Sequence, residues 1–123
     1  HQALTGNDIT VFGDGSQTRS FQYVDDLVEG IVRLLKSDYH LPVNIGNPEE
    51  ISILEFSKEI IELARSGSKI LHLPLPEDDP KVRRPDSRKA KELLDWEPRF
   101  PRKKGLELTL DYFKKVVAEL NKL

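Results

Sequence analysis

Arg19 has the sequence setting of an anion ligand. It lies in the string Gln-Thr-Arg-Ser-Phe-Gln-Tyr-Val, residues 17–24, between a glycine turn and a helical pattern. A guanidinium presents a fixed fork of donors, and this fork fits a phosphate or a carboxylate. The plain structural alternative is a surface salt bridge to a nearby carboxylate, Asp14, Asp25 or Asp26. Position alone leaves both interpretations open.

A second basic cluster, residues 81–84, follows the acidic run of residues 77–79. Such a loop is most simply a solvated segment whose opposite charges neutralise each other. Pro80 and Pro85 restrain the cluster on both sides, however, and restraint lowers the entropy lost when Arg83 binds an anion. On these residues alone, a solvated charged loop and an anion site at Arg83 both remain open.

The turn before Arg19 carries only part of a dinucleotide fingerprint. Gly13 and Gly15 have the spacing of its first two glycines, but Thr18 occupies the place of the third, and no helix starts there. A plain turn after a strand explains the pattern. We expect this chain to hold no NAD and no other cofactor.

Residue patterns predict the elements that position these side chains. Strand-like or extended runs cover residues 8–12, 21–24, 42–46 and 69–73. Helical spacing covers residues 27–35, 54–63, 87–94 and 106–120. The expected N-terminal caps are Asp25 or Asp26, Ser52 with Glu55, and Asp86 or Ser87. Trp96, in the loop before the last helix, is predicted to be a packing anchor.

The strands are too short and too widely spaced for a doubly wound sheet. We predict an α+β fold, a small lobe of the kind that is appended to a larger sheet. A chain of 123 residues has the length of one domain, so we expect a single domain.

Composition excludes several functions. The net charge of −2 gives no electrostatic basis for nucleic-acid binding. No apolar run approaches a membrane span, so we expect no membrane partner. Cysteine is absent, and His1, His40 and His72 lack the spacing of zinc ligands, so no metal site is expected. The chain contains no methionine and opens at His1, from which we expect it to be part of a longer protein.

The string at residues 17–24 and the segment Asp-Asp-Pro-Lys-Val-Arg-Arg-Pro-Asp, residues 78–86, carry a resemblance. Both are similar to motifs of extended short-chain dehydrogenase/reductases that act on sugar nucleotides, and most of all to the UDP-glucuronate decarboxylases. The resemblance covers essentially the whole chain. It implies that residues 1–123 are a single C-terminal sugar-nucleotide-binding lobe, lacking the N-terminal NAD-binding Rossmann domain.

The resemblance also implies roles for individual residues. Val11 and Phe12 would offer main-chain contacts to uracil, Arg19 would contact the diphosphate and sugar, and Arg83 the diphosphate. Gln17 and Tyr23 belong to the same substrate-binding set, whereas Arg84 falls on a variable position that faces solvent. For Phe12 and Tyr23, packing inside the lobe is the alternative.

For the parent protein the resemblance implies an NAD-dependent decarboxylase that converts UDP-glucuronate to UDP-xylose as a homodimer. It would be cytoplasmic in a bacterium and could be lumenal, in the Golgi or endoplasmic reticulum, in a eukaryote. The family's catalytic tyrosine is followed four residues later by lysine, but Tyr23, Tyr39 and Tyr112 are followed there by Leu27, Val43 and Val116. We therefore expect no catalytic residue in this chain beyond an auxiliary Arg19, and no turnover by the isolated chain.

Two alternatives remain open. One is a related nucleotide-sugar epimerase or 4,6-dehydratase, against which the string at residues 17–24 argues. The other is a non-catalytic binding or interaction module, which the missing tyrosine–lysine pair favours.

Overall fold

The computed structural model describes residues 1–120. Its helices are α1 (Gln2–Thr5), α2 (Val24–Leu35), α3 (Ile53–Ala64), α4 (Arg88–Leu94) and α5 (Arg102–Leu120). Its strands are β1 (Ile9–Phe12), β2 (Thr18–Ser20), β3 (Glu50–Ser52), β4 (Ile70–Leu73) and β5 (Val82–Arg83). The predicted mixture of helices and short strands is confirmed.

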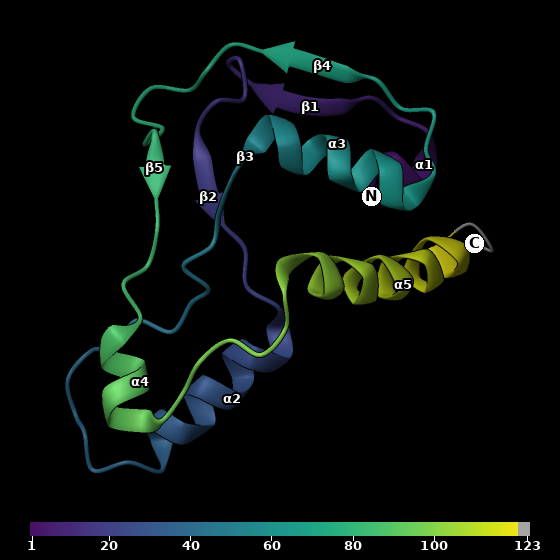
Figure 1. Ribbon diagram of the computed structural model, residues 1–123. Helices are drawn as coiled ribbons and strands as arrows, with labels where there is room; N and C mark the ends of the chain where they lie inside the picture. The colour runs from purple at the N-terminus through teal and green to yellow at the C-terminus, as the bar shows by residue number, and fades with distance from the viewer. Residues whose placement is uncertain (121–123) are drawn as a thin grey trace.

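The elements form an arch (Figure 1). One end holds the strands β1 and β4 with α1 and α3 beneath them, and α5 runs out below α3. The other end holds α2 and α4. A small sheet in the order β3–β2–β5 lies between the two ends and connects them.

The first hydrophobic core lies beneath the β1–β4 pair. These two strands are parallel, with Ile9 opposite Ile70 and Phe12 opposite Leu73. Val11 is fully buried there, and the partly buried apolar side chains of α3 and β4 pack around it. The predicted capping box starts α3, because the Glu55 amide donates to Ser52 Oγ at 3.1 Å.

The second core joins α2 and α4 through Trp96, which is 1% exposed. Ala90 and Leu94 complete its buried centre, and Leu34, Val43 and Ile45 pack against it. The prediction that Trp96 is a packing anchor is confirmed. Among the helices within residues 1–120, none combines the length and the apolar character that a membrane crossing requires.

Residues 42–46 are not a strand, which corrects the sequence prediction. A strand forms only when a neighbour pairs with its backbone, and within residues 1–120 no strand lies against this segment. Val43 and Ile45 instead use their apolar side chains against Trp96. The segment at 21–24 also differs from expectation, because β2 ends at Ser20 and α2 begins at Val24.

The predicted cap of α2 is also wrong. The N-cap position is Tyr23, whose side chain makes no capping bond, and Asp25 and Asp26 lie in the first turn. At α4 the N-cap residue is Ser87, but its hydroxyl donates to Gly46 O, and the Asp86 carboxylate accepts from the Arg88 amide.

Candidate functional site

The turn between β1 and β2 is fixed by its own side chains. Gly13 and Gly15 have positive φ angles of 64° and 77°, which glycine adopts without steric cost. Asp14 Oδ1 accepts from the Ser16 amide and hydroxyl at 2.9 and 2.7 Å, and these bonds lower the pKa of Asp14. The Gln17 side chain spans the turn and donates to Phe12 O at 2.9 Å.

This geometry places three of the predicted ligands. Val11 has no exposed side-chain surface and belongs to the first core. Phe12, one residue on, is 44% exposed at the end of β1, so core packing does not account for it. Gln17 is buried and holds the turn through its amide. The end of β1 is thus held by the Gln17 side chain and presents the accessible aromatic ring of Phe12.

Arg19 extends from β2 into a ring of acceptors. Its Nη1 donates to Thr18 O at 2.7 Å and to Pro80 O at 2.8 Å, and its Nη2 pairs with the Asp79 carboxylate. The Arg19 side chain is only 17% exposed. A salt bridge was one interpretation of this residue, but its partner is Asp79, none of the three carboxylates named as alternatives.

Arg83 lies next to Arg19. Strands β2 and β5 run in parallel (Figure 1). Arg19 and Arg83 are register partners in this pair. Side chains alternate between the two faces of a sheet, so register partners point to the same face. Arg83 is exposed, and within residues 1–120 its side chain forms no ion pair or hydrogen bond.

Arg84 has a different environment from Arg83. Its side chain is 58% exposed and its Nη1 lies 3.7 Å from Glu50 Oε2. The other oxygen of Glu50 accepts from Thr18 Oγ1 at 2.7 Å, so Glu50 of β3 contacts both β2 and the residue that follows β5. An open groove of about 430 Å³ beside Arg84 is lined by Pro85, Asp86 and Arg88 but not by Arg19 or Arg83.

Tyr23 packs against residues other than Arg19 and Arg83. Its ring centroid is 4.7 Å from that of Phe100, and its Cβ lies against the backbone of Gly105 in α5. The ring lines a small cavity of about 180 Å³ together with Gln22 and Arg102. The structure therefore gives Tyr23 a packing role between α2 and α5.

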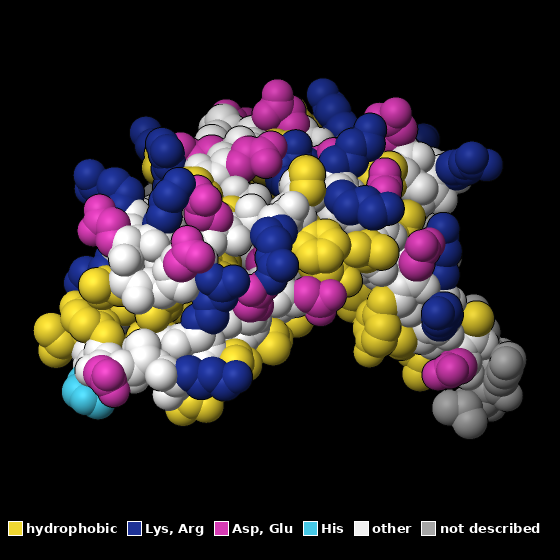
Figure 2. Space-filling model, turned by 60° about the horizontal axis from the view of Figure 1, so that its bottom comes forward, with side chains coloured by type: hydrophobic (Ala, Val, Ile, Leu, Met, Phe, Trp, Pro, Cys, Tyr) yellow, Lys and Arg dark blue, Asp and Glu magenta, His cyan; other side chains and the backbone are white. Residues whose placement is uncertain are grey.

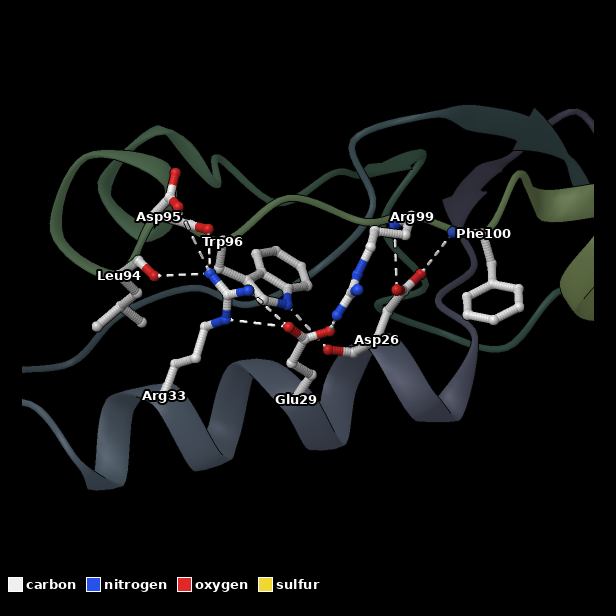
Figure 3. A network of polar contacts seen from close by, with 8 residues as sticks. All are labelled: Asp26, Glu29, Arg33, Leu94, Asp95, Trp96, Arg99 and Phe100. Atoms are coloured by element: carbon white, nitrogen blue, oxygen red, sulfur yellow. Dashed lines mark hydrogen bonds and ion pairs between the residues drawn. The ribbon is translucent and has the colours of Figure 1, made fainter.

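A polar network holds α2 against the loop before α5 (Figure 3). Asp26 is 1% exposed, and its two carboxylate oxygens accept from the amides of Arg99 and Phe100, each at 3.0 Å. The Trp96 indole donates to Asp26 O at 3.0 Å. Glu29 pairs with the guanidinium of Arg99 and accepts from Arg33 Nη2 at 2.6 Å. This network is structural, because its donors and acceptors satisfy one another.

Sequence reasoning missed the role of Asp79. The acidic run was interpreted as a neutralising partner for the basic cluster beside it, whereas Asp79 pairs with an arginine 60 residues earlier in the chain. Local patterns carry no signal for such a contact.

The comparisons with known proteins agree with the resemblance. A family model described as GDP-mannose 4,6 dehydratase matches residues 1–109. The chain belongs to the extended short-chain dehydrogenase/reductase family. One curated member of this family, UDP-glucuronic acid decarboxylase 1 of Danio rerio, is 57% identical over 112 residues. That match covers 91% of this chain and 27% of the zebrafish protein.

Solved structures of the extended family have the same fold. A UDP-glucose 4-epimerase of Thermotoga maritima, solved with UDP-glucose, is 30% identical with a TM-score of 0.89. A UDP-glucuronic acid 4-epimerase of Bacillus cereus, solved with UDP-glucuronic acid and NAD, is 33% identical with a TM-score of 0.85. Each match covers 94% of this chain and 38% of the other. The chain spans about a quarter to a third of the length of the curated relatives it matches.

Proposed function

We propose that this chain is the UDP-sugar-binding part of an NAD-dependent UDP-glucuronate decarboxylase. The register pairing of Arg19 with Arg83 carries the proposal, since it brings two guanidinium groups to one face of the central sheet. Two cations on one face suit a diphosphate, which carries two neighbouring anionic groups. The high identity to a protein named as a UDP-glucuronic acid decarboxylase supports this substrate over other sugar nucleotides.

The two arginines divide the work. Arg19 is recessed and already binds three acceptors, so it offers a ligand few free donors. Arg83 is exposed and keeps its fork of donors available. We assign the main diphosphate contact to Arg83, and to Arg19 the inner wall of the site, near the sugar.

The redox step is assigned to parts of the protein outside this chain. Residues 1–123 carry neither the glycine fingerprint nor the tyrosine–lysine pair that would hold and use NAD. NAD would supply the hydride acceptor for oxidation of the sugar, which makes loss of the carboxylate as carbon dioxide feasible. The chain's own contribution is to bind and orient the UDP-sugar. The exposed apolar face of α2 would pack on the NAD-binding part.

The test uses the full-length protein and two single variants. Arg83→Ala removes a charge-assisted contact to phosphate worth about 1.5–3 kcal/mol, so UDP should bind about 10- to 100-fold more weakly. Arg84→Ala is the matched control, because it removes the same charge one residue away and should change the dissociation constant less than threefold. Calorimetric titration with UDP measures both. Equal losses in the two variants would contradict the assignment of Arg83.

Product analysis separates the alternatives. With UDP-glucuronate and NAD, a decarboxylase releases carbon dioxide and a UDP-pentose, whereas a 4-epimerase returns a UDP-hexuronate of unchanged mass. A simple interaction module has no reason to bind UDP more tightly than pyrophosphate. Exclusive formation of the 4-epimer, or equal affinity for UDP and pyrophosphate, would replace the proposed function by the corresponding alternative.

A further inference from the structure

The Asp79 carboxylate lies where the acidic loop contacts β2 of the central sheet. It pairs with Arg19 Nη2, and the carbonyl of the next residue, Pro80, accepts from Arg19 Nη1 at 2.8 Å. One residue further on, Lys81 O accepts from the Thr18 amide at 2.8 Å. Three consecutive residues of the loop are thus attached to β2 directly before β5 begins.

The backbone conformation at Asp78 and Asp79 directs the Asp79 side chain toward Arg19. Asp78 has a φ angle of 62°, in the left-handed region that aspartate and asparagine adopt more readily than most residues. Pro80 restricts the backbone of the residue before it to extended conformations. The chain therefore turns at Asp78 and returns Asp79 toward β2. Asp78 itself is exposed, and in the described part of the chain its carboxylate forms no ion pair.

The ion pair of Asp79 with Arg19 also reduces the repulsion between Arg19 and Arg83. Arg19 and Arg83 are register partners, and like charges directly opposite one another destabilise a sheet. Asp79 compensates the recessed cation, with side-chain exposures of 25% for Asp79 and 17% for Arg19. Arg83 can then lie beside Arg19 while its own charge stays available to a ligand.

We propose that Asp79 is a positioning residue: its ion pair with Arg19 fastens the acidic loop to β2 and thereby holds Arg83 in register for a diphosphate. This rests on the proposed function for the ligand, but the fastening itself can be measured without one. Asp79 does not touch the ligand. It acts through the register of β5.

The test compares Asp79→Asn with Asp78→Asn in the full-length protein. Both variants remove one negative charge, and asparagine tolerates the left-handed conformation at position 78. Asp79→Asn should weaken UDP binding about 5- to 20-fold, with Asp78→Asn within twofold of wild type. In an Arg83→Ala background, Asp79→Asn should have no further effect on UDP affinity, because nothing is left to position. A purely structural loss would instead add to the effect of Arg83→Ala.

Hydrogen exchange provides the second, ligand-free measurement. The Thr18 amide, which donates to Lys81 O, should exchange at least tenfold faster in Asp79→Asn. The Gly13 amide, which donates to Leu73 O between β1 and β4, is the internal reference and should not change. If wild type fails to bind UDP, the proposed function is wrong, and the exchange rate of Thr18 alone decides whether Asp79 fastens the loop. Unchanged exchange at Thr18, or tighter UDP binding by Asp79→Asn, would overturn the proposal.

Discussion

Charge compensation distinguishes the arginines of the central sheet. Arg19 is paired with Asp79 and Arg84 lies close to Glu50, while Arg83 is left exposed between them. The sequence indicated Arg19 and Arg83 through their local settings. The sequence could not indicate which arginine has its charge compensated. Asp79 and Glu50 each lie more than thirty residues from β2, which they contact, and no helical or strand pattern spans such a separation.

Asp86 provides a residue-scale prediction about pH. Its carboxylate binds the Arg88 guanidinium and amide, and these contacts lower its pKa to about 2 from the ordinary value of 3.8. Because the folded-state pKa is lowered, the contribution to stability is complete above pH about 4 and is lost as the pH falls through about 2. A carbon-13 NMR titration of the Asp86 carboxyl checks the value. Arg88→Ala removes the guanidinium contact and keeps the amide, so it should raise this pKa toward 3.8, and an unchanged midpoint would contradict the stated cause.

At the scale of elements, periodicity predicted those segments that bury a face locally. The runs that became β1, β4, α3 and α5 lie within a few residues of their predicted bounds. The apolar side chains of β1, β4 and α3 meet in the first core. The strands β3 and β5 were missed because they consist of three and two residues and depend on β2 for their pairing. Residues 42–46 carry a strand pattern, but a pattern cannot supply the neighbour that a strand requires.

The contact of α2 with the second core predicts the effect of a single methyl group. A Cβ on Gly30 would lie 2.5 Å from Ile45 Cγ2 and 3.1 Å from the Trp96 indole. Alanine favours a helix over glycine by about 1 kcal/mol, but overpacking costs about 1–3 kcal/mol, so Gly30→Ala should be destabilising overall. Urea unfolding measures the change in free energy of unfolding.

Gly67 provides the matched control for this substitution. A Cβ there would meet no atom within 4 Å, and its backbone is not in the left-handed region. Gly67→Ala should therefore change the free energy of unfolding by less than about 0.5 kcal/mol. A Gly30→Ala protein as stable as the Gly67→Ala protein would show that the α2–Trp96 contact is looser than described.

At the scale of the whole molecule, the arch exposes much apolar surface. Apolar side chains gather around α2 and along the inner side of the limb formed by α5 (Figure 2). On α2 the exposed members are Val24, Leu27, Val28, Ile31, Val32 and Leu35. A continuous apolar helix face of this kind is usually covered in a native protein. The sequence pattern showed that α2 is amphipathic but not how little of its apolar face the chain itself would cover.

We expect the isolated chain to self-associate through this face of α2. Replacing Val28 and Ile31, each 51% exposed, with lysine should shift the chain toward monomer at the same concentration. Leu71, which is 48% exposed on β4, lies at the other end of the arch, and Leu71→Lys should leave the association unchanged. Sedimentation velocity measures the three proteins, with circular dichroism to verify folding. A wild-type chain that is monomeric at high concentration would contradict the expectation.

The pairing of β1 with β4 has a consequence for synthesis. The partner of Ile9 is Ile70, so the first strand leaves the ribosome long before its neighbour exists. At translation rates of about 5–20 residues per second, β1 waits for several seconds with its backbone groups and Val11 exposed to solvent. During that interval α2 and α3 can already form as local structures. The ladder between β1 and β4 can therefore close only after α2 and α3 have been synthesised, and until then the unpaired β1 is accessible to chaperones.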